Sequence, residues 1–346
     1  MNFVCRDCGN EYSVKGNDFQ CACGGLFDYR GPNITSRTDL ISLGEPVTPV
    51  VNEQFGRLIL NLKLDYFMPT GSFKDRGART LISAINKLGI KEIVEDSSGN
   101  AGAAIAAYAA AAGMNCQIYV PESASGAKLK QIKSYGAQVV TIPGSRQDTA
   151  EAVKKACREK YYASHIFNPL FFEGTKTIAH EIVHQLGYPK SVVVPVGNGS
   201  LLIGLYRGFA ALGKIPELHA IQSENCAPLH NAYKGLTIRN ENIPGKKNTS
   251  AKGIAVPNPP RLPEMIRAID ESGGSVTTVS DEHIISAKDT LHKRGIYIET
   301  TAAVGVAGAI NLYGDQKSPI NTVDCHTPST DGGILVPLTG SGLKEL

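Results

Sequence analysis

The stretch Pro69-Thr70-Gly71-Ser72-Phe73-Lys74-Asp75-Arg76-Gly77 places one lysine, Lys74, at the point where a loop meets a helix. A proline and a glycine end the preceding apolar run, Leu58–Leu64, which predicts a strand. The apolar spacing that follows predicts a helix beginning near Lys74, with Ser72 as its capping residue. The positive end of a helix dipole disfavours a charged ammonium group, so it favours the neutral amine that forms Schiff bases.

The composition is that of an ordinary globular protein: 346 residues, 42% hydrophobic and 19% charged. This length allows two lobes and a small appendage. The net charge of +3 and the lack of a dense Lys/Arg run argue against binding to nucleic acid or to a membrane surface. The first residues do not have the pattern of a signal peptide, and no apolar run reaches the ~18–20 residues of a membrane span. We therefore expect a cytoplasmic protein.

Short β-prone runs alternate with helical patterns along most of the chain. The expected strands lie at 92–95, 117–120, 138–141, 192–196, 218–222, 275–279 and 334–338. The expected helices lie at 101–112, 127–135, 148–160, 175–186 and 201–212, and a long exposed loop is expected at 239–260. Alternation of this kind predicts an α/β fold with parallel sheets, whose ligand sites gather at the carboxyl ends of the strands.

Four of the eight cysteines crowd the first 23 residues, as Cys5-x2-Cys8 and Cys21-x-Cys23. Two thiol pairs with this spacing can close a tetrahedral zinc site, and disulfides are less expected without a secretory signal. Because Cys-x-Cys is tighter than the usual Cys-x2-Cys, a metal-free ribbon stays open as the alternative. The other cysteines are expected to be ordinary core or surface residues: Cys116, Cys157, Cys226 and Cys325.

Two further junctions between an expected strand and a helix could hold anionic groups. Ser97-Ser98-Gly99-Asn100-Ala101-Gly102 follows the strand at 92–95, and the backbone N–H groups of such a turn can cradle a carboxylate or phosphate. Gly197-Asn198-Gly199-Ser200-Leu201 follows the strand at 192–196, and its glycines let the backbone close on a phosphate. Taken alone, each motif is more typical of a plain helix-capping turn.

A last junction, Thr339-Gly340-Ser341-Gly342, follows the strand at 334–338. A hydroxyl flanked by glycines there can approach the edge of a flat ring, although a simple turn explains it as well. Together the parts fit one ligand: a lysine for an aldehyde, a phosphate cradle, an amide for a phenol oxygen and a hydroxyl for a ring nitrogen. That ligand is pyridoxal phosphate (PLP).

In order and spacing, these motifs resemble the fold-type II PLP enzymes, the tryptophan synthase β-like superfamily, over nearly the whole chain. Residues 69–77 look like the lysine motif of threonine synthases, and the N-terminal Cys21-x-Cys23-Gly24-Gly25 is similar to theirs. The resemblance implies a two-lobed α/β fold with parallel-rich open sheets flanked by helices and a small N-terminal cysteine ribbon. It places the ribbon at 1–30, a large PLP-binding domain at 31–77 and 168–346, and a small domain at 78–167. It also implies a homodimer.

Carried over position by position, the resemblance implies that Lys74 forms a Schiff base with PLP and takes the substrate's α-proton. Asn100 would bond the cofactor's 3-oxygen, and Thr339 its pyridine nitrogen. A threonine hydroxyl leaves that nitrogen unprotonated, which favours elimination and replacement over transamination. The phosphate would be held by Gly197, Asn198, Gly199, Ser200 and Leu201. The substrate would be bound by the turn of Ser97, Ser98, Gly99 and Ala101. Apart from the resemblance, we expect four further residues on the substrate side, each with ordinary packing or capping as the alternative: His165, Asn168, Phe171 and Glu299.

The chain departs from the threonine synthase pattern between His165 and Thr177. Phe171 stands where an arginine is expected to hold the phosphate of O-phosphohomoserine, and Ile166 stands where a polar residue is common. Losing a bidentate cation would weaken recognition of a dianion. Three hypotheses therefore stay open. They are a threonine synthase, an enzyme of β-elimination or β-replacement on serine, O-phosphoserine or threonine, and a non-catalytic regulatory protein.

Overall fold

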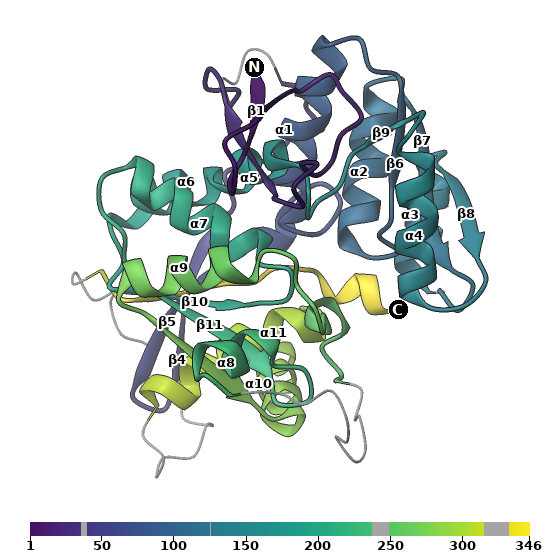
Figure 1. Ribbon diagram of the computed structural model, residues 1–346. Coiled ribbons are helices and arrows are strands. Elements are labelled where there is room, and N and C mark those ends of the chain that lie inside the picture. The colour runs from purple at the N-terminus through teal and green to yellow at the C-terminus, as the bar shows by residue number, and fades with distance from the viewer. Residues whose placement is uncertain (36–39, 125, 237–248, 315–331) are drawn as a thin grey trace. The chain divides into compact units, whose positions relative to one another are not determined.

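The computed structural model describes residues 1–35, 40–124, 126–236, 249–314 and 332–346, and these form two compact units (Figure 1). The first unit comprises Met1–Pro46, Met68–Thr177 and Lys344–Leu346. The second comprises Val47–Phe67 and Ile178–Leu343. The segments predicted above to form one large PLP-binding domain, 31–77 and 168–346, are divided between the two units. Residues 31–46, 68–77, 168–177 and 344–346 lie in the first unit, and the others lie in the second. Those domain boundaries stay a prediction.

The N-terminal residues fold into a small antiparallel sheet within the first unit. Its strands are β1 (Asn2–Cys5), β2 (Glu11–Ser13) and β3 (Phe27–Arg30), with β1 in the centre. Phe3 and Phe27 are both buried, and their rings stack with centroids 5.8 Å apart. This aromatic pair gives so short a sheet an apolar centre of its own.

The main sheet of the first unit has four strands, all parallel, in the order β8-β7-β6-β9. They are β6 (Glu92–Glu95), β7 (Asn115–Pro121), β8 (Gln138–Ile142) and β9 (Tyr161–Tyr162). The helices are α1 (Lys74–Lys87), α2 (Asn100–Ala111), α3 (Ala127–Ser134), α4 (Arg146–Ala156) and α5 (Pro169–Thr175). Helices α2 and α4 pack on the sheet, and α1 packs against α2 and α5. The small residues of α2 allow this close contact, since six of its eight alanines are buried.

The second unit is built on a six-stranded sheet in the order β12-β11-β10-β13-β5-β4. Its strands are β4 (Val50–Phe55), β5 (Leu58–Lys63), β10 (Ser191–Pro195), β11 (Glu217–Ser223), β12 (Ser275–Val279) and β13 (Ile334–Pro337). Only the edge strand β4 runs antiparallel to its neighbour. Every residue of β10 is buried, as a continuous apolar strand requires when helices cover both faces.

The helices of the second unit are α6 (Thr177–Leu186), α7 (Ser200–Ala211), α8 (Pro228–Tyr233), α9 (Leu262–Ser272), α10 (Asp281–Lys293) and α11 (Thr300–Tyr313). Figure 1 shows α7 and α9 on one side of the sheet and α10 and α11 on the other. Helix α11 packs on β10, β11, β12 and β13. Gly308 permits this close approach, because a Cβ there would lie 2.3 Å from the side chain of Ile221.

The α/β fold with parallel-rich sheets flanked by helices is confirmed, and the expected strands agree with the observed ones to within about two residues. The helix expected at 175–186 is observed as α6, which begins two residues later, at Thr177. One expectation is corrected. Part of the loop expected at 239–260 is buried, since the described residues Thr249, Ala251 and Ile254 are covered. The rest of that loop, up to residue 248, lies outside the described residues.

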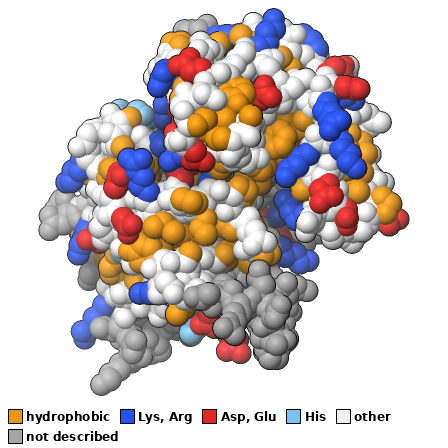
Figure 2. Space-filling model, viewed as in Figure 1, with side chains coloured by type: hydrophobic (Ala, Val, Ile, Leu, Met, Phe, Trp, Pro, Cys, Tyr) orange, Lys and Arg blue, Asp and Glu red, His pale blue; other side chains and the backbone are white. Residues whose placement is uncertain are grey.

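The surface mixes charges of both signs. Figure 2 shows Lys and Arg side chains on the part of the first unit where α3 and α4 lie, with Asp and Glu side chains among them. Among the residues described, no helix combines the length and the apolar character that a membrane crossing requires.

Candidate active site

Lys74 is the first residue of α1, as the sequence predicts, but Ser72 does not cap the helix. The capping position is Phe73, and no side chain bonds to the first N–H groups there. The Ser72 hydroxyl is fully buried and has no hydrogen-bond partner among the described residues. The loop is shaped instead by Asp75, whose carboxylate accepts hydrogen bonds from the backbone N–H of Thr70, at 2.7 Å, and from its hydroxyl.

A lysine from the far end of the sequence completes this loop. Lys344 Nζ donates to the backbone oxygen of Thr70, at 2.6 Å, and to Gln131 Oε1 on α3, at 2.7 Å. Burial raises the pKa of Asp75 to about 6, although the bonds from Thr70 and the charge of Lys344 oppose the rise. The loop before Lys74 is thus held by one buried carboxyl group and one buried ammonium group.

The ring of Phe171, on α5, lies beside Lys74. Lys74 Nζ lies 4.7 Å from the centroid of the Phe73 ring and 5.7 Å from that of Phe171. Phe171 is completely buried, and a Cβ on Gly77 would lie 2.4 Å from its ring. The side chain that replaces the expected arginine is therefore packed tightly between α5 and α1, as an apolar residue should be.

His165 forms a buried pair with Glu95, the last residue of β6. The distance between His165 Nδ1 and Glu95 Oε1 is 2.6 Å, and the two side chains are 6% and 0% exposed. Burial raises the pKa of Glu95 well above its usual value and lowers the pKa of His165 well below its own. In both cases the cost of burying a charge is the main cause.

The turn from Ser97 to Asn100 leads into α2, and Asn100 is the first helical residue. The Ser97 hydroxyl accepts a hydrogen bond of 3.2 Å from the N–H of Gly99. Gly102 makes the turn possible, because a Cβ there would lie 1.8 Å from the backbone oxygen of Ser97. Ala101 is buried, whereas Ser98 is partly exposed. The sequence-predicted cradle is therefore a real helix start, with backbone N–H groups at its mouth.

Asn168 has a structural task in this unit. It caps α5 by accepting a hydrogen bond of 3.1 Å from the N–H of Leu170. Its amide group donates to the hydroxyl of Tyr161 at 2.8 Å. These bonds account for both polar atoms of its side chain, so the described structure supports Asn168 as a capping residue. A contact with substrate stays a prediction.

In the second unit, the segment Gly197–Leu201 joins β10 to α7. Gly199 takes φ +82°, a left-handed conformation natural to glycine, and a Cβ there would lie 2.3 Å from Met265 Sδ. Ser200 and Leu201 open the helix and are buried, whereas Asn198 is partly exposed. The geometry matches an anion cradle: a narrow glycine turn with the first N–H groups of a helix beyond it.

Thr339 follows β13 in the second unit and is 3% exposed. Its Oγ1 is buried and has no hydrogen-bond partner among the described residues. Glu299, expected on the substrate side, is the residue before α11, and its backbone N–H bonds to the oxygen of Gly340 at 3.0 Å. A Cβ on Gly340 would lie 2.3 Å from Glu299 Oε1, so the turn at Gly340 is as tightly packed as the glycine turn at Gly199.

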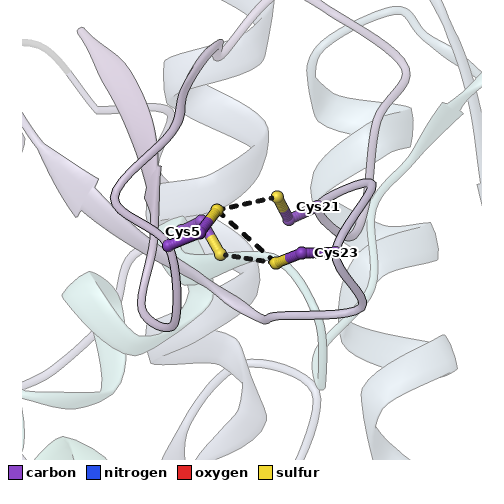
Figure 3. Close-up of side chains that lie close together, drawn as sticks. Cys5, Cys21 and Cys23 are labelled. Carbon is purple, nitrogen blue, oxygen red and sulfur yellow. Dashed lines mark hydrogen bonds between the residues drawn. The ribbon is translucent and has the colours of Figure 1, made fainter.

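The four N-terminal cysteines come together in the first unit. One ligand atom from each of Cys5, Cys8, Cys21 and Cys23 lies within 4.8 Å of the others, and Figure 3 shows the sulfur atoms gathered between two turns. The nearest pairs are 3.5 Å apart, which is too far for a disulfide at about 2.05 Å. A hydrogen bond with the Tyr12 hydroxyl helps lower the pKa of the Cys21 thiol to about 6.

The other cysteines are ordinary where they are described. Cys116 and Cys157 are buried and Cys226 is partly exposed, whereas Cys325 lies outside the described residues.

Two residues that contribute to the site, Glu95 and Lys344, were not predicted from the sequence. Glu95 follows two apolar residues, Ile93 and Val94, at the end of the strand before the Asn100 turn, and an acid in that position was a usable signal. Lys344 had no such signal, because its partner, Thr70, lies 274 positions away.

Comparisons with known proteins agree with this geometry. The profile of the family described as "Pyridoxal-phosphate dependent enzyme" matches residues 41–323. The chain is 31% identical to the threonine synthase of Methanocaldococcus jannaschii, covering 99% of this chain and 92% of that one. It is 33% identical to the threonine synthase of Methanosarcina acetivorans, covering 99% and 91%.

Among solved structures, the threonine deaminase of T.th. has a TM-score of 0.69 at 26% identity, covering 86% of this chain and 92% of that one. Maize serine racemase has a TM-score of 0.71 at 22% identity, covering 86% and 88%, a likeness that concerns the fold. With its lysine at a helix start and most of its length matched, the chain belongs to the family of pyridoxal-phosphate-dependent enzymes.

Proposed function

We propose that this protein is a PLP-dependent lyase that converts O-phosphohomoserine and water to threonine and phosphate. The observation that carries the proposal is the position of Lys74, the first residue of α1, in a chain that aligns over 99% of its length with proteins named threonine synthase. A lysine in that position is disfavoured as an ammonium ion by the helix dipole, which suits covalent binding of an aldehyde.

The described residues fit PLP. Thr339 presents a buried hydroxyl that no other described residue satisfies, as expected if a ring nitrogen completes it. The turn of Gly197 and Gly199 leaves no room for side chains, as expected of a phosphate cradle. Lys74 would bind the cofactor aldehyde, and Asn100 would donate to the 3-oxygen. PLP, when bound, supplies an electron sink for the substrate's α-carbon.

The chain's own residues would then orient the amino acid and move its protons. The N–H groups of the Ser97–Ala101 turn would bind the α-carboxylate, where the start of α2 favours negative charge. Lys74, displaced by the substrate's amino group, would take the α-proton. His165 would face the substrate's side chain.

A second candidate is β-elimination or β-replacement on serine, O-phosphoserine or threonine. The observation that favours it is the burial of Phe171, whose ring fills the space between α5 and α1. An arginine is thereby lost from the position expected to hold a substrate phosphate. A site without that cation would bind a dianion weakly.

Product analysis separates the two. Purified holoenzyme would be incubated with O-phosphohomoserine, serine, O-phosphoserine and threonine in separate reactions. Threonine and phosphate formed from the first alone support the first candidate. Pyruvate or 2-oxobutyrate, or a serine-derived product that needs an added sulfur nucleophile, supports the second.

A matched pair of lysine variants tests the cofactor assignment. Lys74→Ala is expected to abolish the visible absorbance of bound PLP, and Lys87→Ala, at the exposed end of the same helix, is expected to keep it. Equal absorbance in both variants would refute the role given to Lys74.

We also propose that the cysteine cluster binds a structural zinc ion. A tetrahedron of sulfur atoms about 2.3 Å from zinc has edges of about 3.8 Å, close to the 3.5 Å separations found here. Metal analysis should find about one zinc per chain in the wild type and in Cys226→Ser. It should find none in Cys23→Ser. Equal zinc in the two variants, or none in the wild type, would contradict the proposal.

Finally, we propose a cytoplasmic homodimer, which rests on the resemblance to threonine synthases. Sedimentation of the holoenzyme at several concentrations tests the oligomeric state, and a monomer throughout would contradict it.

A further inference from the structure

Glu95 and His165 arise from neighbouring strands at one edge of the first unit's main sheet. Strands β6 and β9 are parallel, with Val94 opposite Tyr162, and the N–H of Ala163 bonds to the oxygen of Val94 at 2.9 Å. Glu95 ends β6, and His165 follows β9 after two more residues. The pair therefore stands at the carboxyl ends of parallel strands, where ligands bind in folds of this kind.

The pair and Lys74 share one aromatic neighbour, Phe171. The ring centroid of Phe171 lies 5.7 Å from Lys74 Nζ and 6.1 Å from the centroid of the His165 ring. Lys74 and His165 thus lie against the same aromatic ring. The charge of Lys74 acts on the protonation of both Glu95 and His165.

Each member of the pair has one polar atom without a partner among the described residues. Glu95 Oε2 is completely buried and accepts no hydrogen bond there. His165 makes its hydrogen bond through Nδ1, and 6% of its side chain stays exposed. Nε2 is therefore the ring nitrogen that remains for a bond to a ligand.

Burial favours the uncharged form of both groups. The pKa of Glu95 is raised and the pKa of His165 is lowered, mainly because the interior disfavours charge. An uncharged carboxyl group can donate the proton on Oε1 to Nδ1, which leaves the ring hydrogen on Nε2. The imidazole then has an N–H donor at Nε2, away from Glu95.

We propose that His165, positioned by Glu95, is a second acid–base residue that serves the substrate's side chain, whereas Lys74 serves the α-carbon. The inference rests on the proposed PLP chemistry and extends it to the leaving group and the incoming water. It does not depend on whether the substrate carries a phosphate.

The proton transfers balance. When the bond from the substrate carbon to the leaving oxygen breaks, both electrons stay on the oxygen, which takes the proton from Nε2. The proton on Glu95 Oε1 moves to Nδ1, and a carboxylate remains on Glu95. When water bonds to the substrate's β-carbon, its surplus proton goes to Nε2 and the Nδ1 proton returns to Glu95.

Charged and titratable groups around the pair adjust its acidity. The carboxylate form of Glu95 is stabilised by Arg146, and by Lys74 when its amine is charged rather than joined to the cofactor, whereas Asp96 opposes it. Tyr162 donates a 2.7 Å hydrogen bond to Asp96 Oδ1, which keeps that acid occupied. Burial raises the pKa of the Cys116 thiol, and a negative charge on Glu95 raises it further. These positive charges stabilise the Glu95 carboxylate, so the pair releases its proton more readily than burial alone would allow.

The first test reads the tautomer without any substrate. Holoenzyme labelled with ¹⁵N-histidine would be titrated by NMR, and the His165 signals identified by their loss in His165→Gln. We expect a neutral ring with its hydrogen on Nε2 at about pH 6, where an ordinary histidine is largely charged. Glu95→Gln should keep this tautomer, because its amide also donates to Nδ1. A charged ring, or a hydrogen on Nδ1, would overturn the proposal.

The second test separates the two proton transfers. In D₂O, the wild type exchanges the substrate's α-proton and forms product, each of which can be measured. In His165→Gln and in Glu95→Gln, we expect product formation to fall by at least about 100-fold with exchange retained within about threefold. His184→Gln, an exposed histidine on α6, should leave both unchanged. Cofactor absorbance and thermal unfolding show whether each variant is folded.

Loss of exchange and product together, in folded variants, would mean that the pair is merely structural and would refute the proposal. If O-phosphohomoserine is inert but serine or threonine reacts, the proposed threonine synthase reaction fails. The ratio of product formation to α-proton exchange, measured with the amino acid that reacts, then still decides the role of His165.

Discussion

Lys344 Nζ donates a hydrogen bond of 2.6 Å to the backbone oxygen of Thr70, four residues before Lys74. The same ammonium group bonds to Gln131 on α3, so one side chain joins the lysine loop to a neighbouring helix. The carboxylate of Asp75 fixes Thr70 from its other side. The position of the reactive lysine therefore depends on a buried polar network as well as on the helix that it begins.

Removing this ammonium group should loosen the loop. Lys344→Met keeps the length of the side chain but leaves Gln131 Oε1 without this donor, and the Thr70 oxygen keeps only the 3.1 Å bond from Gln131 Nε2. We expect a loss of about 1.5–3 kcal/mol in the free energy of unfolding, as for a hydrogen bond to a charged group. Urea denaturation measures it, with Lys344→Arg as the control that keeps the charge. Unchanged stability in Lys344→Met would show that the bond is not formed in solution.

The buried carboxyl group of Asp75 should make stability depend on pH. Its pKa is about 6 in the folded protein, mainly because of burial, against about 3.9 when unfolded. The folded state therefore holds its proton more firmly. The associated stabilisation is complete below pH 3.9 and disappears as the pH rises through 6, by about 3 kcal/mol in total.

Asp75→Asn isolates this effect. The free energy of unfolding, measured at several values between about pH 4 and pH 7, should fall more steeply in the wild type than in the variant. Parallel curves would show that Asp75 titrates alike in both states. Comparing the slopes cancels the contributions of the other acids, and any constant loss from the altered bonds to Thr70.

Thr339 should matter to the cofactor more than to the fold. Its hydroxyl is buried without a partner among the described residues, so Thr339→Val should cost less than about 1 kcal/mol in the cofactor-free protein, or stabilise it. The same substitution should weaken PLP binding, which titration followed by absorbance measures. Thr339→Ser keeps the hydroxyl and should retain most of the affinity. Equal affinity in the valine and serine variants would contradict the role of the hydroxyl.

Two glycines of the α2 turn should respond differently to alanine. At Gly102 a Cβ would lie 1.8 Å from the backbone oxygen of Ser97, so Gly102→Ala should lose about 1–3 kcal/mol of stability. At Gly99 the nearest atom would be the Ser97 hydroxyl at 3.7 Å, and φ is −107°, so Gly99→Ala should fold with little loss. Thermal unfolding measures both. Similar losses at the two positions would show that the turn is not shaped by the contact at Gly102.

Local patterns were enough to locate the elements that carry the chemistry. The strand-to-helix junctions at Lys74, Asn100 and Ser200 begin at or near their expected residues, because glycine turns and apolar periodicity act over a few neighbours. The prediction that Ser72 caps α1 was wrong. The loop is held instead by Asp75, a residue of the helix itself, whose carboxylate accepts a hydrogen bond from the N–H of Thr70. The sequence alone does not show whether the Ser72 hydroxyl or the Asp75 carboxylate accepts the hydrogen bond that shapes this loop.

The sequence by itself determined the α/β class, the order of the junctions and the lysine suited to PLP, since each depends on residue type and spacing. Only the tertiary structure decided which distant residues meet: Glu95 with His165, Lys344 with Thr70, and the four cysteines with one another. Such contacts are chosen by burial, which pairs a polar group with whichever partner the packed chain brings within reach.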